Sequence, residues 1–261
     1  MQQNSHLIIR IYRIIRIFCH TITGLIIAAI ILPVLGKESK KSLIKWWCGG
    51  LLRAFHIKVI TFGNLPPAST KGVMFVANHV SWSDIHALNS QIASRFIAKA
   101  EIRNWPIFGY LASKANPLFI DRSKRQVAAK LVESTAESLA DGDNLCFFPE
   151  GTTTDGTHVL PFKSSVLQAA INANTIIWPV AIRYVNLDGS INTAMAYAGE
   201  TGLVESMQRI IQLKNAIVEL HFLTPIDASK QNRRDLTQQA YDAIITKLAL
   251  QPNLSHRAAL E

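Results

Sequence analysis

Hydrophobic and polar residues follow two different patterns along the body of the chain. Short apolar runs bounded by turn-forming residues are typical of strands that a sheet buries on both faces. Longer amphipathic segments lie between several of these runs and are typical of helices that pack on such a sheet. We expect strands at residues 58–62, 73–77, 95–99, 117–121, 145–148, 175–184 and 216–223.

The amphipathic segments predict at least three helices. In the clearest of them Val127, Leu131 and Leu139 fall on one helical face, and Asp141-Gly142 ends the pattern. We expect these helices at residues 124–140, 162–173 and 233–250.

This alternation predicts the fold class and the organisation of the chain. Strands and helices that follow one another in this way form an α/β domain, with a mixed and largely buried β-sheet flanked by helices. We expect one such domain over residues 58–251, a frayed tail over 252–261, and a separate membrane-anchoring helical region over 1–57.

The N-terminal region carries the longest apolar run. Residues 17–35 are nineteen residues, IFCHTITGLIIAAIILPVL, in which Cys19 and His20 are the only ionisable groups. About 20 apolar residues in a helix span the roughly 30 Å hydrocarbon core of a membrane. We expect a retained anchor, either a true span or a helix that enters and returns on one leaflet. The alternatives are a buried core helix and a cleaved signal peptide, and the run lacks a small-residue cleavage site.

Positive charge is concentrated in the same region. The protein has 27 Lys and Arg against 18 Asp and Glu, a net charge of +9, and residues 1–60 hold nine of the basic residues and one acid. A nucleic-acid-binding protein would spread its cations over the folded body, so the partition argues against that class. Arg10, Arg13 and Arg16 recur every third residue, which predicts a cationic stripe suited to anionic lipid headgroups.

A second apolar piece, at residues 43–57, is too short to cross a bilayer and carries Trp46 and Trp47. Tryptophans concentrate at membrane interfaces, so we expect this piece to dip into the same leaflet. Basic residues flank the first run on both sides and leave its orientation open. The three cysteines show neither metal-ligand nor disulfide spacing, which predicts no metal site and favours a reducing compartment, the cytoplasmic face of a bacterial inner membrane.

A polar cluster follows the strand expected at 73–77. His79 stands at the end of this strand, and Asp84 follows five residues later at the start of an expected helix. A tight strand-to-helix turn would bring the imidazole to the carboxylate, which fixes the ring tautomer and leaves the other ring nitrogen free to accept a proton from a hydroxyl. The alternative is that both residues only cap the helix.

Two more clusters follow strands. Phe148-Pro149-Glu150-Gly151-Thr152 offers a carboxylate, a hydroxyl and a glycine that permits close approach of a ligand to the backbone. Arg122 follows the strand expected at 117–121 and presents a guanidinium suited to phosphate or carboxylate. Each has a simpler alternative, namely an ordinary polar loop and an arginine paired with a nearby acid.

Together these motifs resemble the glycerolipid acyltransferase family, whose type member is 1-acyl-glycerol-3-phosphate acyltransferase. An H-x-x-x-x-D pair alone is a weak signal, but F-P-E-G-T about 70 residues later makes it specific. The resemblance covers about residues 58–225, in blocks at 78–84 (H-x-x-x-x-D), 99–122, 148–152 with 160–163, and 178–182.

The resemblance implies transfer of a fatty acyl group from a thioester, acyl-CoA or acyl carrier protein, to the free hydroxyl of a lysophospholipid at a lipid bilayer. His79 would be the base, and Asp84 would orient it. No protein nucleophile and no cofactor beyond the co-substrate are expected, and the oligomeric state stays open. The acceptor would be bound by Arg122, Glu150, Gly151 and Thr152, with Lys163 at its headgroup or at a donor phosphate.

Three positions depart from the family pattern. Thr153 stands where acid-specific members commonly have Arg, Asn116 where the second block usually has Gly, and Ser164-Ser165 brings Ser where many members have Gly. These forms resemble the branch of lyso-ornithine lipid and lysophosphatidylcholine acyltransferases. The default acceptor is 1-acyl-sn-glycerol-3-phosphate, which would give phosphatidic acid, and lyso-ornithine lipid or another lysolipid is the alternative.

Two other classes of function are weighed against this interpretation. A membrane-bound thioesterase or hydrolase would need a nucleophile; the chain has no G-x-S-x-G, and Ser81 and Ser83 are the local candidates. A lipid-binding protein without catalysis is the third class. We expect His86 to pack or to face solvent, and residues 105–109 to begin a helix that lines the site or packs in the core.

Overall fold

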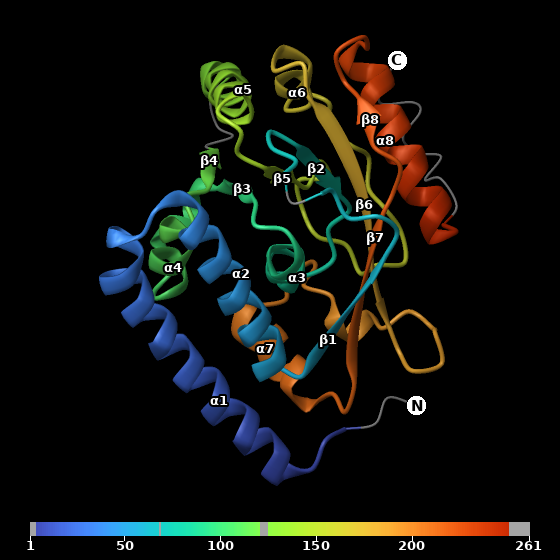
Figure 1. Ribbon diagram of the computed structural model, residues 1–261. Helices are drawn as coiled ribbons and strands as arrows, with labels where there is room; N and C mark the ends of the chain where they lie inside the picture. The colour runs from blue at the N-terminus through green and yellow to red at the C-terminus, as the bar shows by residue number, and fades with distance from the viewer. Residues whose placement is uncertain (1–3, 68, 121–124, 251–261) are drawn as a thin grey trace.

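A mixed β-sheet forms the centre of the molecule. The computed structural model describes residues 4–67, 69–120 and 125–250, and Figure 1 shows the sheet of this part of the chain between two groups of helices. All seven expected strands are present within about one residue of the predicted bounds, and the short β8 was not expected. The strands are β1 (Ile57–Phe62), β2 (Met74–Ala77), β3 (Arg95–Lys99), β4 (Leu118–Ile120), β5 (Leu145–Phe147), β6 (Ile176–Val185), β7 (Ala216–Phe222) and β8 (Ile226–Asp227).

The sheet order is β1-β7-β6-β2-β5-β3-β4, with β8 paired to β6. Strand β2 lies parallel to both of its neighbours, β5 and β6, whereas β6 and β7 are antiparallel. The expected mixed α/β sheet is therefore confirmed. Because the ends of parallel neighbours meet at one edge, the loops after β2 and β5 lie side by side, which is where ligand sites form in such sheets.

Successive residues of β2 face two different hydrophobic cores. Phe75 and Ala77 face the core that α2, α3 and α7 cover, and Met74 and Val76 face the core that α5, α6 and α8 cover. Side chains alternate across a strand, so a strand buried on both faces must be apolar throughout. Continuous apolar runs such as VMFVA follow from this demand.

The helices form the outer layers on both faces of the sheet (Figure 1). The helix expected at 162–173 is wrong in length, because the Lys163 N–H donates to the Pro149 carbonyl at 3.0 Å and holds that part of the chain against the loop after β5. Helix α7 was not expected. The helices are α1 (Leu7–Ile26), α2 (Lys37–Ala54), α3 (Ser83–Gln91), α4 (Phe108–Lys114), α5 (Arg125–Ala140), α6 (Gln168–Asn172), α7 (Leu203–Gln212) and α8 (Arg233–Leu248).

Helix α2 belongs to the core of the body. Cys48, Leu51, Leu52 and Phe55 are buried, and their spacing places them on one helical face. The last three join the same hydrophobic core as Phe75 of β2. Its apolar stripe therefore packs on the body, and the regions before and after residue 57 share one core. Trp46 is exposed, so leaflet contact of the outer face of this segment stays a prediction.

Helix α1 runs antiparallel to α2 on the outside of the molecule (Figure 1). The chain reverses through a π-helical turn, Ile27–Ile31, and a 3-10 turn, Leu32–Val34. The contact is close: a Cβ at Gly24 would lie 2.5 Å from Trp47 Nε1. The His20 ring stacks on the Trp47 ring with centroids 5.3 Å apart. The two helices are therefore a packed pair.

The cationic stripe expected on α1 is only partly formed. Arg13 is 4% exposed, and its guanidinium donates to the carbonyls of Ile211 and Leu213 at 2.8 and 2.6 Å. These carbonyls lie at the C-terminal end of α7, where unpaired acceptors favour a cation. Arg13 thus holds α1 to the body and does not face lipid.

The outward face of α1 is apolar and exposed. By length and composition, the helical stretch Leu7–Val34 is sufficient to cross a membrane, and 17% of its most apolar window is buried in the protein. Large exposed side chains of this size on a folded protein indicate a lipid or protein contact surface. They are Leu7, Ile8, Ile9, Ile11, Tyr12, Ile14, Ile15, Phe18, Ile22, Ile26, Ile30, Ile31 and Val34.

Candidate active site

The strand-to-helix turn after β2 brings the predicted pair together. His79 Nδ1 lies 2.8 Å from Asp84 Oδ2. The same carboxylate oxygen accepts the N–H groups of Val80 and Ser81 at 2.8 and 2.9 Å. Asp84 therefore braces the turn that precedes α3 and also contacts the imidazole, so it does more than cap the helix.

The second oxygen of Asp84 accepts the hydroxyl of Tyr184 at 2.5 Å. Tyr184 comes from β6, the parallel neighbour of β2, and its hydroxyl also lies 2.7 Å from Ser83 Oγ. Burial, and then the charge of Asp84, raise the pKa of Tyr184 well above its ordinary value, so its hydroxyl stays a donor. Sequence reasoning missed Tyr184, although a tyrosine on a strand expected to be buried requires a partner for its hydroxyl.

The contacts of Asp84 decide which nitrogen of His79 is open. A carboxyl group that accepts hydrogen bonds from all of its neighbours suits the ionised form, so Nδ1 carries the ring proton and Nε2 keeps its lone pair. The ring stacks on Phe148 with centroids 4.0 Å apart and planes 9° apart. Within the described chain Nε2 has no hydrogen-bond partner, and 18% of the side chain is exposed, in a cavity. This is the geometry of a general base.

Glu150 links the two loops at this edge of the sheet. Its Oε1 accepts the N–H of His79 and its Oε2 accepts the N–H of Leu160, both at 2.6 Å. Burial raises the pKa of this carboxyl to about 8, against the lowering effect of the two N–H groups. Glu150 thus positions the backbone of His79, and its contact with an acceptor stays a prediction.

The remaining predicted site residues have different positions. Gly151 is buried with φ +75°, a left-handed conformation that glycine adopts without strain. Thr152 is exposed and lines the cavity, whereas Lys163 is exposed and outside its lining. The structure thus brings together His79, Asp84, Glu150, Gly151 and Thr152, whereas Lys163 reaches the same loop through its backbone and has its side chain outside the cavity lining. Arg122 lies outside the described residues.

The departures from the family pattern have local explanations. Asn116 has φ +53°, and asparagine is one of the few side chains that tolerate this region, so it can stand in a glycine position. Thr153 donates its hydroxyl to the Tyr197 carbonyl. Thr153 therefore fixes a loop at the cavity wall and adds no charge there.

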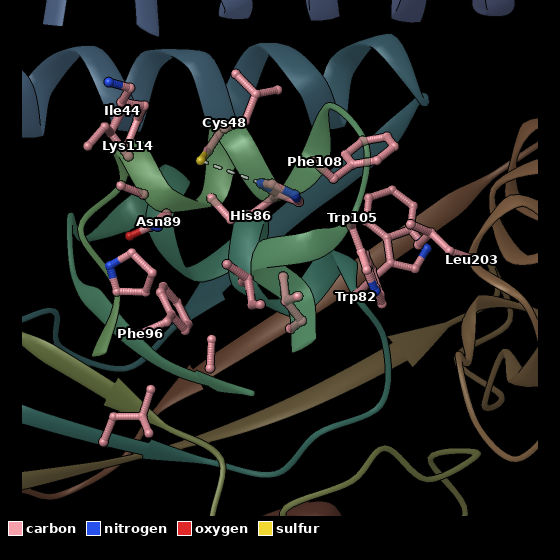
Figure 2. Close-up of a pocket in the computed structure, with 18 of the residues that line it drawn as sticks. Ile44, Cys48, Trp82, His86, Asn89, Phe96, Trp105, Phe108, Lys114 and Leu203 are labelled. Atoms are coloured by element: carbon pink, nitrogen blue, oxygen red, sulfur yellow. Dashed lines mark hydrogen bonds between the residues drawn. The ribbon is translucent and has the colours of Figure 1, made fainter. Parts of the chain in front are cut away.

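The turn that carries His79 opens into a cavity of about 460 Å³. The cavity runs from His79 and Phe148 to the helical pair, where Ala28 and Trp47 line it. Trp105 also lines it, and Figure 2 shows this residue beside Trp82 and Phe108. The expectation that residues 105–109 line the site is thus met at Trp105 and Phe108. The walls are mostly apolar and aromatic, which suits a hydrocarbon chain.

The serines beside His79 are unsuited to nucleophilic attack. Ser81 and Ser83 are fully buried, and the two hydroxyls hydrogen-bond each other at 3.1 Å beneath the turn. A nucleophile must reach the substrate carbonyl, so the hydrolase alternative loses its local candidates. Within residues 4–67, 69–120 and 125–250, no group of three or more His, Cys, Asp or Glu could hold a metal ion.

Comparison with known proteins identifies related chains. Residues 56–183 match the family model described as Acyltransferase. The lyso-ornithine lipid O-acyltransferase of Pseudomonas aeruginosa is 35% identical over 225 residues, 84% of each chain. The 1-acyl-sn-glycerol-3-phosphate acyltransferase of Neisseria meningitidis serogroup B is 36% identical over 185 residues, 71% of this chain and 72% of that one.

One solved structure shares the fold. The crystal structure of the 1-acyl-sn-glycerophosphate acyltransferase PlsC from Thermotoga maritima superposes with a TM-score of 0.64 at 21% identity. The match covers 91% of this chain and 96% of that one.

Proposed function

Because the chain belongs to the acyltransferase family, we propose that it transfers a fatty acyl group from a thioester, acyl-CoA or acyl carrier protein, to the free hydroxyl of a lysophospholipid. The observation that carries this proposal is the His79–Asp84 pair, with the open nitrogen of His79 facing an apolar cavity. The pair supplies a base and the cavity supplies a place for a chain.

In this reaction one residue, His79, carries the proton from the acceptor hydroxyl to the leaving thiolate. His79 Nε2 accepts the proton of the lysolipid hydroxyl as its oxygen bonds to the thioester carbonyl carbon. The C–S bond breaks when the tetrahedral intermediate collapses, and the imidazolium returns the proton to the leaving thiolate. Asp84 stabilises the imidazolium, and Tyr184 with the turn amides holds Asp84 in place. No covalent acyl-enzyme is needed.

The cavity binds an acyl chain in this scheme. Burying a methylene group contributes about 0.8 kcal/mol, so a long chain gains much of its affinity from apolar walls. The walls at the far end come from α1 and α2, through Gly24, Ala28 and Leu43. The helical pair therefore completes the binding site for the chain.

The acceptor to test first is 1-acyl-sn-glycerol-3-phosphate, for which the relative from Neisseria meningitidis is named, and whose product is phosphatidic acid. Thr153 favours a second candidate, lyso-ornithine lipid, because it places a neutral hydroxyl where a phosphate would benefit from a cation. Relatives named for that acceptor include one that aligns with 84% of this chain.

The protein associates with membranes, as its apolar N-terminal helix and the lipid substrates of its relatives indicate. We infer that α1 lies along the surface of the cytoplasmic leaflet of a bacterial inner membrane. Its inner side is held by Arg13 and Trp47, and its outer side is apolar. Flotation with anionic vesicles checks membrane binding, and iodide quenching of a dye on exposed Cys19 then checks the position of α1. A dye that the outer leaflet of the vesicle shields from iodide supports the inference. A helix whose end reaches the far side of the bilayer contradicts it.

The activity is tested with purified protein in detergent. Thiol release is followed with acyl-CoA or acyl carrier protein as donor, and with lysophosphatidate or lyso-ornithine lipid as acceptor. We expect His79→Ala to lower kcat by about 10²- to 10⁴-fold. His158→Ala is the matched control, because His158 lies 3.2 Å from Asp155 on the surface and forms a second His–Asp pair. Full turnover by His79→Ala, or free fatty acid as the main product, would contradict the proposal.

A further inference from the structure

One wall of the cavity carries three polar side chains that acyl transfer at His79 does not use. They are Cys48 of α2 with His86 and Asn89 of α3, here named the polar wall cluster. Figure 2 shows the three together, between Ile44 and Phe96, with the Cys48–His86 contact drawn as a dashed line. Sequence reasoning expected His86 to pack or to face solvent, and the structure places it on the cavity wall.

The ring of His86 is held firmly. Its Nδ1 lies 3.6 Å from Cys48 Sγ, and the rings of Trp47 and Trp82 pack edge-on against it, each with centroids 5.9 Å away. Two aromatic contacts and one thiol contact fix both the position and the rotation of the ring. Any ligand group that meets His86 therefore meets a preformed partner.

Both members of the thiol–imidazole contact are neutral at physiological pH. Burial raises the pKa of Cys48 to about 12 and lowers that of His86 to about 4. We assign the thiol as the donor to Nδ1 in this contact, which places the proton of the neutral ring on Nε2. His86 lines the cavity, and Cys48 is its one hydrogen-bond partner among the described residues, so Nε2–H has no hydrogen-bond partner there.

Asn89 adds a second donor on the next turn of α3. The residue is 3% exposed, and its Oδ1 accepts the N–H of Ser94 at 2.9 Å. That bond leaves the two amide protons directed elsewhere, and no partner for them occurs in the described part of the chain. Residues three apart share a helical face, so the donors of His86 and Asn89 lie at adjacent depths of the cavity.

Unpaired donors are unfavourable beside a plain hydrocarbon chain. A buried polar group without a hydrogen bond costs about 1 to 3 kcal/mol, and a chain of CH₂ groups would displace any water that satisfies it. Phenylalanine and leucine would line the same wall without this cost. The wall is therefore better suited to a chain that brings an oxygen atom to this depth.

We propose that the polar wall cluster selects an acyl chain that carries a hydroxyl group. The hydroxyl oxygen accepts the Nε2–H of His86 and an amide proton of Asn89, and the rest of the chain lies on the apolar wall. The chain belongs either to the thioester donor or to the lysolipid acceptor, since the chemistry is the same for both. This inference rests on the proposed acyl transfer.

The kinetic test compares hydroxylated with unsubstituted chains. In one arm acyl-CoA donors carry a hydroxyl at successive carbons from C3, and in the other arm the lysolipid chain carries it. We expect one position in one arm to raise kcat/KM at least about tenfold over the plain chain. His86→Phe keeps a flat ring between the two tryptophans, and should bring that ratio close to one. Ile85→Leu, a volume-conserving change on the same wall, should keep the ratio.

A binding test separates this inference from the proposed reaction. Free hydroxylated and plain fatty acids are titrated against the full protein, with the intrinsic tryptophan fluorescence as the signal, to which Trp47 and Trp82 on the cavity wall contribute. Preferential binding of a hydroxylated acid, lost in His86→Phe and in His86→Leu, supports the cluster even without turnover. Thermal unfolding verifies that each variant is folded. Equal ratios for every hydroxyl position in wild type, or a preference that both His86 variants retain, would overturn the inference while acyl transfer itself stands.

Discussion

The two ends of the cavity are built differently. At the His79 end, strand ends and tight turns surround buried carboxylates with directed hydrogen bonds. The opposite wall consists of α1 and α2, which pack mainly through apolar side chains. Buried charge is tolerated only with well-placed partners, so the first region allows one geometry. Apolar packing has no preferred direction, so the second region can change shape at smaller cost. The first region is thus suited to chemistry and the second to choosing the chain.

The largest effect should come from the charge of Asp84. Asp84→Asn keeps the shape but removes the negative charge that stabilises the protonated ring of His79. We expect kcat to fall by about 10²- to 10⁴-fold, with a smaller change in KM. Steady-state kinetics with both substrates checks this, and a loss confined to KM would place Asp84 in binding instead.

A smaller effect is expected from a substitution of Tyr184, because it removes one hydrogen-bond donor from the carboxylate of Asp84. Tyr184→Phe should lower the free energy of unfolding by about 1.5 to 3 kcal/mol, because a hydrogen bond to a buried charge is lost. Urea unfolding measures this. Tyr241→Phe is the control, since its hydroxyl lies 3.5 Å from the Val159 carbonyl in the other core. Equal losses in both variants would show that the charge of Asp84 adds nothing.

Arg13 is one of the points where α1 depends on directed hydrogen bonds, so its removal tests the contrast directly. Arg13→Met should lower the free energy of unfolding by about 1 to 2 kcal/mol, because two carbonyls at the end of α7 lose their donor. Arg16→Met removes the same charge from a side chain whose guanidinium lies over the Tyr12 ring, and should cost little. If both variants bind anionic vesicles equally but differ in stability, Arg13 acts by attaching α1 to the body. Equal stability of the two variants would contradict this role.

Removing the Glu150 carboxyl group is expected to change how steeply the free energy of unfolding depends on pH. Its pKa is about 8 in the folded protein and near the ordinary 4.5 when unfolded. The folded state therefore binds the extra proton between these values, and its contribution to stability is complete below pH 4.5 and is lost as the pH rises through 8. Glu150→Gln should flatten this fall, as urea unfolding from pH 5 to 9 would reveal. An unchanged slope would place the titrating group elsewhere.

Local sequence patterns predicted the strands, the His79–Asp84 turn and the membrane-associated region because each depends on neighbours in the chain. The shortened α6 was missed because Lys163 bonds to Pro149, a partner that helical periodicity does not contain. The role of Arg13 was missed for the same reason, since its partners are about 200 residues away. Periodicity placed Arg13 on a stripe with Arg10 and Arg16 and gave no sign that it was buried.

The sequence by itself determined the family of this protein and the candidate for its base: residue types at fixed spacing after two buried strands identify both. Only the tertiary structure decided how that chemistry is held and what it meets. Parallel pairing of β2 with β5 and β6 brings Glu150 and Tyr184 to the turn, and packing of α2 on α3 decides that His86 lies on the cavity wall and not in solvent. Such contacts join residues distant in the chain, and local patterns carry no information about them.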